Sequence, residues 1–181
     1  MQHARFQHRT ARVAAALALA GAGALAVSPV AGASRARTAT VAACATSGLV
    51  IWMNTTGNGT AGSIYYTLEF TNLSGHSCTL AGYPGVSAVG LSGHRLGSAG
   101  GRERFSPAHT VTLTASGAHQ SATATLRIVE AGNFPGAACG MTTAAGIRVY
   151  PPNQTASKVV PFPFSACSHT GPVILRVRVV Q

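Results

Sequence analysis

Carboxylate side chains are almost absent from this sequence, which has no aspartate and three glutamates, Glu69, Glu103 and Glu130, in 181 residues. Glu69 falls on the polar side of an alternating segment, Glu103 stands between two arginines, and Glu130 follows more than twenty-five residues later. A glycosidase needs two carboxyl groups on opposite sides of one bond. The shortage of acids therefore argues against this class of enzyme and against metal sites built from carboxylates.

A nucleophile with a neighbouring base is missing as well. Ser87 lies in "GVSAVG", which is one residue longer than the Gly-x-Ser-x-Gly nucleophile elbow and precedes no helical pattern. The later histidines occur in or beside expected turns, at a spacing too irregular for chelation: His76, His94, His109, His119 and His169. We therefore predict no catalytic, metal-binding or cofactor-binding residues and a protein that is not an enzyme but a noncatalytic module, structural or ligand-binding. An enzyme acting on cell-wall polymer or peptide is the alternative.

The N-terminal residues have the pattern of an export signal. Arginines at positions 5, 9 and 12 precede the 15-residue apolar run "VAAALALAGAGALAV", and "AGA", ending at Ala33, is a small-x-small cleavage site. The run is shorter than the roughly 20 residues that span a bilayer. We expect a signal peptide at 1–33, a mature chain of 148 residues without a transmembrane segment, and a secreted or cell-envelope location.

A second interpretation of this region concerns Cys44. The segment "VAAC" at 41–44 fits the loose pattern of a lipoprotein box, in which the cysteine is acylated. Arg35 and Arg37 interrupt the apolar approach that such a signal needs, and acylation would leave one cysteine unpaired. We therefore favour cleaved secretion, with a flexible lead-in at 34–43, and keep lipid anchoring at Cys44 as the alternative.

Four cysteines lie beyond the expected signal peptide: Cys44, Cys78, Cys139 and Cys167. An even number of cysteines in an exported protein indicates disulfides, and four cysteines allow three pairings. We favour the pairs 44–78 and 139–167 because each closes a loop within one half of the chain, where consecutive strands pack together. None of the spacings is Cys-x-x-Cys, so zinc binding is disfavoured.

Basic residues outnumber acids, with a formal net charge of +10. Removal of residues 1–33 takes away three of thirteen basic residues and no acid, which leaves about +7. Only Arg102 with Arg104 and Arg176 with Arg178 are close in sequence, so the charge is expected to be dispersed. Partners are unknown. The candidates are an anionic wall polymer, bound weakly and in a salt-sensitive way, and another envelope protein. We expect no specific binding of nucleic acid.

Apolar and polar residues alternate with period two through most of the chain after residue 44, and no stretch combines a helical apolar period with caps. In the last segment, we expect Leu175 and Val177 to face the core and Ile174 to face outward. The clearest strands are expected in "SIYYTLEFT", "HTVTLTA", "AHQSATATLRIVE" and "GPVILRVRVVQ".

Short strands bounded by turn residues predict an all-β protein, an antiparallel two-sheet sandwich of the immunoglobulin-like kind, as a single domain at 44–181. The prolines in "VVPFPF" cannot donate ladder hydrogen bonds, so this segment is expected at a sheet edge.

The glycine-rich stretch 78–97 is expected to form a turn, a short strand and a second turn. We expect Gly82 and Gly85 to supply backbone angles that other residues avoid, with Tyr83 and Pro84 between them. Tyr83 either packs over the Cys44–Cys78 disulfide, which we favour, or is displayed for a partner, as in an inhibitor that presents residues 81–86.

This stretch also carries a resemblance to a family. "FTNLSGHSCTLAGYPGVSAVGLSGHRLG", "VTLTASGAHQSATATLRI" and "VYPP" before the last cysteine resemble domain of unknown function 4232, found in exported actinobacterial proteins. The resemblance implies export, this fold and the disulfides, but no known activity. Similar sequences often have an acid where this one has Ala88, Val89 and Gly90, and Pro-Gly where it has Ser116-Gly117. The matching residues are Phe70, Thr71, Asn72, Cys78, Thr79, Leu80, Gly82, Tyr83, Pro84 and Gly85.

Overall fold

The computed structural model describes residues 40–181. About half of these residues lie in β-strands, whose side chains alternate between the two faces of a sheet. The helical elements are short turns at Thr46–Gly48, Ala131–Asn133 and Gly136–Cys139 (α1). The strands are β1 (Leu49–Thr60), β2 (Ser63–Asn72), β3 (Cys78–Ala81), β4 (Gly85–Val89), β5 (Arg95–Leu96), β6 (Gly101–Arg102), β7 (Thr110–Leu113), β8 (Ser121–Val129), β9 (Met141–Tyr150), β10 (Lys158–Cys167) and β11 (Leu175–Val177).

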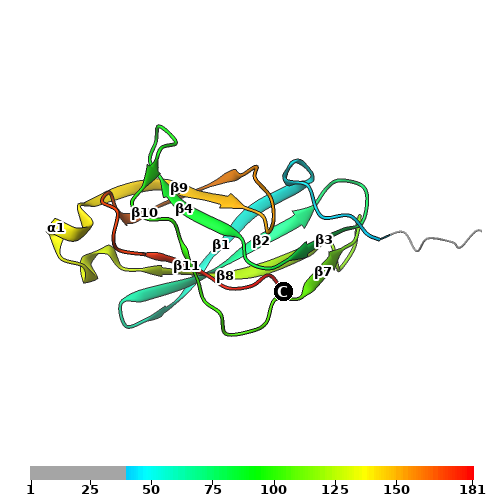
Figure 1. The fold of residues 1–181 in the computed structure, drawn as a ribbon, viewed down its shortest axis with the longest axis horizontal. Coiled ribbons are helices and arrows are strands. Elements are labelled where there is room, and N and C mark those ends of the chain that lie inside the picture. Colours follow the sequence, from blue (N-terminus) through cyan, green and yellow to red (C-terminus); the bar gives the residue numbers. More distant parts are fainter. Residues whose placement is uncertain (1–39) are drawn as a thin grey trace, which may run out of the picture. The chain divides into compact units, whose positions relative to one another are not determined.

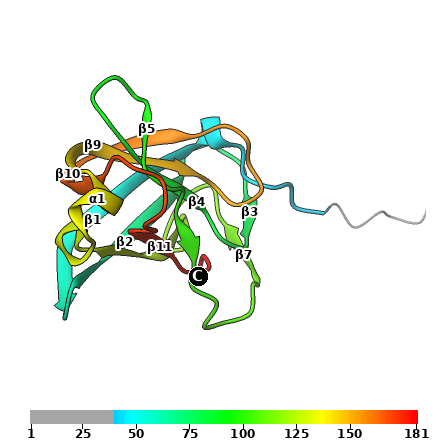
Figure 2. The same cartoon turned by 60° about the vertical axis from the view of Figure 1, so that its left-hand side comes forward.

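Two sheets form the layers of the fold (Figures 1 and 2). One sheet has the strand order β1-β2-β8-β11-β6 and the other β10-β9-β4-β5, while β3 and β7 pair separately. The expected all-β fold is thus confirmed. The expectation of purely antiparallel pairing is wrong at one edge, because β11 and β6 pair in parallel. This pairing brings the segment after β6 onto the sheet that contains β8 and β11.

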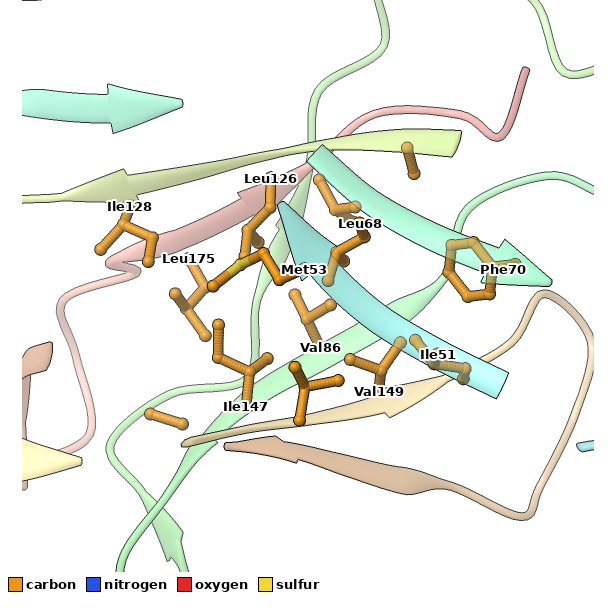
Figure 3. Close-up of a cluster of buried hydrophobic side chains, with 14 of the residues drawn as sticks. Ile51, Met53, Leu68, Phe70, Val86, Leu126, Ile128, Ile147, Val149 and Leu175 are labelled. Atoms are coloured by element: carbon orange, nitrogen blue, oxygen red, sulfur yellow. The ribbon is translucent and has the colours of Figure 1, made fainter. Parts of the chain in front are cut away.

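The core lies between the two larger sheets (Figure 3). Leu68 and Leu126 from one sheet face Ile147 and Val149 from the other, and Met53 lies beside them. These five side chains are buried, as period-two alternation requires when one face of each strand is removed from water. The opposite faces of the sheets stay accessible and carry the charged residues.

The alternation in β2 and β8 confirms the expected strands. The prolines of "VVPFPF" lie in β10, which is an edge strand, as predicted, and the register shifts between Pro161 and Phe164. Near the C-terminus the expected alternation is wrong at one residue, since Ile174 is buried like Leu175. The strand there begins only at Leu175, so the Ile174 side chain need not point to the face opposite Leu175.

Both predicted disulfides are present, Cys44–Cys78 and Cys139–Cys167. The Cys44–Cys78 disulfide explains why the expected flexible lead-in does not extend to residue 43. Thr79 N–H donates to the Ala42 carbonyl, and Ala43 forms a parallel bridge with Thr79. The neighbouring disulfide holds this short segment against β3, so the expectation of flexibility is wrong for residues 42 and 43.

The expected signal peptide at 1–33, its cleavage near Ala33 and the first part of the lead-in lie outside the described residues. Residues 40–181 form one compact unit. In that part of the chain, no helix is both long and apolar enough to cross a membrane.

Asn72 explains one half of the motif shared with the resembling family. Its side chain is fully buried and its amide nitrogen donates to the carbonyls of His76 (2.7 Å) and Thr114 (3.0 Å). Its amide oxygen accepts from the backbone N–H and the hydroxyl of Ser74. Asn72 therefore fixes the turn between β2 and β3 and ties it to the end of β7.

Candidate functional site

Two adjoining depressions lie where β4 begins, and they share Gly85, Arg102 and Tyr150. Their volumes are about 650 and 490 Å³. We refer to the two together as the arginine groove, and to the larger and smaller depressions as its first and second lobes. Each lobe exceeds the roughly 300 Å³ at the lower end of small-molecule sites.

The first lobe is lined by Tyr83, Arg102, Arg104, His109 and Tyr150, among others. One wall is the segment after β6, which is attached to the turn before β4 because the Tyr83 hydroxyl donates to the Ser106 carbonyl at 3.2 Å. The Arg102 guanidinium lies over the Tyr83 ring, 5.6 Å from its centroid. These contacts hold the turn and the wall together.

The opposite wall of the first lobe is the turn after β9. Asn153 has a left-handed backbone conformation with φ of 60° and donates from its amide to the Ala81 carbonyl at 3.1 Å. Asparagine tolerates this conformation better than most residues. Its hydrogen bond joins the turn to the end of β3, so both walls are anchored to the 81–85 segment.

The second lobe is lined by His94, Arg95 and Arg148 in addition to the shared residues. His94 and Arg95 come from the hairpin between β4 and β5, which projects from its sheet (Figure 2). Arg148 lies on β9, opposite Ser87 of β4, and donates to the Gly93 carbonyl in the hairpin turn at 2.7 Å. One bond from Arg148 therefore fixes the hairpin while its remaining donors stay available.

The two glycines beside Tyr83 differ in their backbone conformation. Gly82 has φ of +104°, and nothing lies within 4 Å of an added Cβ, so its backbone conformation is what requires glycine. Gly85 has no positive φ, so the expectation that it supplies an unusual backbone angle is wrong. A Cβ at Gly85 would lie 3.4 Å from the Tyr150 Cβ, which is an ordinary van der Waals distance, so the available space does not require glycine there.

Arg102 and Arg104 line the groove, whereas Glu103 between them does not. Glu103 lines a neighbouring depression, which also includes Arg102, and its carboxylate is paired with Arg127 and with Arg178. Four of the seven arginines in residues 40–181 line the groove, and no carboxylate does. The expectation of dispersed charge is therefore wrong for this face of the protein.

The guanidinium groups of the groove are largely unpaired in the part of the chain that the structure describes. There, Arg95 and Arg104 have no hydrogen bond or ion pair, and Arg102 has only its contact with the Tyr83 ring. An anion that enters the groove would meet several free N–H donors, and hydrogen bonds to charged groups are about twice as strong as neutral ones.

Glu103 belongs to a second arginine cluster on the outer face of the five-stranded sheet. It is buried, and its two carboxylate oxygens lie 3.3 Å from Arg127 Nη1 and from Arg178 Nε. Arg178 also lies over the rings of Phe105 (4.9 Å) and Tyr65 (5.5 Å). We refer to these five residues as the Glu103 clamp. Its positive charges have a partner within the protein.

Glutamate and histidine side chains line different depressions in residues 40–181, although Ser87 and His94 both line the second lobe. Glu103 and Glu130 line depressions that contain no histidine, while His94 and His109 line the groove without a carboxylate. Ser87 is buried and makes no side-chain hydrogen bond to a histidine in this part of the chain. The described residues also contain no cluster of three potential metal ligands.

The structure brings together some of the residues singled out from the sequence. Gly82, Tyr83 and Gly85 line the first lobe, and the buried Pro84 lines the second. Tyr83 is half-buried, and the contacts given above are with Arg102 and Ser106 rather than with the Cys44–Cys78 disulfide. It is thus neither the core lid nor the freely displayed residue that the sequence suggested.

The sequence did not identify several groove residues as a site, among them Arg95, Arg148, Tyr150, Asn153 and Gln154. The alternation in "GIRVY" could have placed Arg148 and Tyr150 on one face of β9. Their position beside Gly85 and Ser87 depends on the register between β4 and β9, which the sequence pattern alone does not give.

Comparison with known proteins adds one match. The family model described as "Domain of unknown function (DUF4232)" matches residues 44–181. No curated protein and no solved structure matches the chain. The expected likeness to immunoglobulin domains therefore stays a prediction, while the resemblance based on the Cys-Thr-Leu-x-Gly-Tyr-Pro-Gly motif is confirmed.

Proposed function

We propose that this chain, which belongs to the DUF4232 family, works outside the cytoplasm as a noncatalytic module that binds an anionic ligand in the arginine groove. The observation that carries the proposal is a groove lined by four arginines and two tyrosines and by no carboxylate. Like charges gathered in a depression disfavour the free protein, and a bound anion relieves this repulsion.

The extracytoplasmic location is supported by two features. Both cysteine pairs are oxidised, and disulfides persist mainly in oxidising compartments. The sequence at 1–33 has the pattern of a secretory signal. These two features together support secretion or residence in the cell envelope.

A noncatalytic role is supported by the separation of the titratable groups. General acid–base catalysis needs an acid and a base near the same reacting atoms. In the described pockets, glutamate and histidine side chains line different depressions. Binding requires only the arginines and tyrosines that the groove does contain.

A matched pair of single substitutions tests the proposal. Inorganic polyphosphate serves as the probe, and its affinity is measured by titration calorimetry at physiological ionic strength. We expect Arg102→Ala to weaken binding about tenfold, because each lost charged hydrogen bond contributes more than about 1 kcal/mol. Arg176→Ala removes the same charge from a side chain that lines neither lobe, and is expected to weaken binding less than about twofold because no direct contact with the ligand is lost.

Equal losses for the two variants would contradict the proposal, because binding would then follow the net charge rather than the groove. If the unmodified protein bound neither polyphosphate nor any other polyanion, the proposal would be contradicted as well. Circular dichroism of both variants provides the control for folding.

A further inference from the structure

Arg102 and Arg104 line the first lobe of the arginine groove, Arg95, Arg102 and Arg148 line the second, and Tyr150 lines both. From this arrangement we infer that the ligand is an acidic oligosaccharide, whose anionic groups bind the arginines of both lobes while a sugar ring stacks on Tyr150. The inference rests on the proposed function and specifies the chemical class of the ligand.

The separate anion sites follow from the lining residues. Arg102 and Arg104 line the first lobe, and Arg95 and Arg148 line the second. Arg102 reaches both lobes, so the cationic surface is continuous between them. A ligand with one anionic group would occupy one lobe, whereas a ligand with repeated anionic groups would occupy both.

Tyr150 lies at the junction of these sites. It lines both lobes, is half-buried, and lies opposite Gly85 in the pairing of β4 with β9. The Tyr83 ring, by contrast, is already covered by the Arg102 guanidinium. Tyr150 therefore provides the ring between the lobes, with a broad apolar face and a polar hydroxyl edge. The apolar C–H face of a pyranose ring matches such a surface.

The polar lining suits a ligand with many hydroxyl groups. Gln154 and His109 line the first lobe, and His94 lines the second, so donors and acceptors without fixed charge surround the arginines. Orientation by a few polar groups is typical of small-molecule sites. The lobe volumes of about 650 and 490 Å³ leave space for more than one sugar ring.

Two other polyanions differ from this ligand in testable ways. Polyphosphate offers charge but no ring for Tyr150. Single-stranded nucleic acid offers bases that stack on aromatic side chains above a basic groove. We favour the saccharide because the disulfides indicate an oxidising compartment, outside the cytoplasm where nucleic acids are made.

The test uses galacturonic acid and its dimer and tetramer as probes in titration calorimetry. Because engagement of two linked sites raises avidity, we expect the tetramer to bind at least about tenfold more tightly than the monomer. We expect Arg95→Ala to remove most of this gain, since the substitution takes away part of the second anion site.

The role of the ring is tested with Tyr150→Leu. We expect this variant to bind the tetramer about tenfold more weakly, and polyphosphate within about twofold of the unmodified protein, as loss of a stacking partner alone predicts. Tyr150→Phe keeps the ring and is expected to restore tetramer binding. The matched control is Trp52→Leu, which removes an aromatic side chain that is 43% exposed and lies outside the groove.

The outcomes separate the two proposals. If polyphosphate binding depends on Arg102 but the tetramer gains nothing over the monomer, or Tyr150→Leu binds it normally, the saccharide inference is overturned and the proposed function stands. Tighter, Tyr150-dependent binding of oligothymidylate also overturns the inference, in favour of single-stranded nucleic acid. If polyphosphate, the tetramer and oligothymidylate all fail to bind, both proposals are overturned.

Discussion

The arginine groove and the Glu103 clamp take residues from the same short segment, and their arginines are in different electrostatic states. In the clamp, Arg127 and Arg178 share one buried carboxylate. In the groove, Arg102 and Arg104 face a depression without any carboxylate. Three consecutive residues, Arg-Glu-Arg, thus divide between a neutralised cluster and a cationic one, because the Glu103 carboxylate pairs with Arg127 and Arg178 and not with either neighbouring arginine.

The comparison separates stability from binding. A buried glutamate with two arginine partners fixes the segment after β6 against the sheet, and removal of such a partner leaves charges without compensation. The groove has no equivalent partner within the described residues, so its arginines contribute little to folding. Unpaired charges that lower the stability of the free protein are expected at a site where a ligand binds.

The largest effect on stability is expected for Glu103→Ala. Arg127 and Arg178 would lose their shared partner, but both are partly exposed, with side-chain exposures of 32% and 40%, so water would compensate in part. We expect the free energy of unfolding to fall by about 2–3 kcal/mol, below the cost of a fully buried pair. Urea denaturation provides the measurement. If the free energy of unfolding fell by less than about 0.5 kcal/mol, as it does at exposed sites, the clamp would stabilise the fold no more than the groove does.

An intermediate effect is expected for Tyr83→Ala. The substitution removes a half-buried ring, its contact with Arg102 and its hydrogen bond to Ser106. We expect a loss of about 1–2 kcal/mol, since truncation of a fully buried aromatic side chain costs more. Thermal melts that also include Tyr83→Phe separate the two contributions. A melting temperature equal to that of the unmodified protein would show that the ring does not fix the groove wall.

The smallest effect on stability is expected for the double variant Arg95→Ala, Arg104→Ala. Both side chains are exposed and have no partner among the described residues. We expect the free energy of unfolding to change by less than about 0.5 kcal/mol, because exposed substitutions rarely do more. Urea denaturation at low ionic strength is the measurement. A clear loss of stability would contradict the view that these arginines serve binding rather than folding.

Local patterns were sufficient for much of the fold. Alternation identified β2 and β8, the prolines placed β10 at an edge, and the spacing of the cysteines gave the correct disulfides. Each of these features depends on neighbouring residues or on simple loop closure. The alternation was wrong at Ile174, where the chain has not yet entered its strand.

The candidate site was only partly predictable. Gly82 and Tyr83 were identified from their turn, but the groove also needs Arg148 and Tyr150 from a strand far along the chain, and the register between β4 and β9 places them there. In the same way, the sequence showed only that Glu103 stands between two arginines. The parallel pairing of β6 with β11 gives it partners at positions 127 and 178.

The sequence by itself determined that the chain forms strands, how its cysteines pair, and that acids are too few for most carboxylate chemistry. These properties follow from residue type and short-range periodicity. Only the tertiary structure decided which arginines are neutralised and which gather in a groove. Electrostatic interactions depend on the distance between charges in space. Here that distance is set by the register between β4 and β9 and by the pairing of β6 with β11.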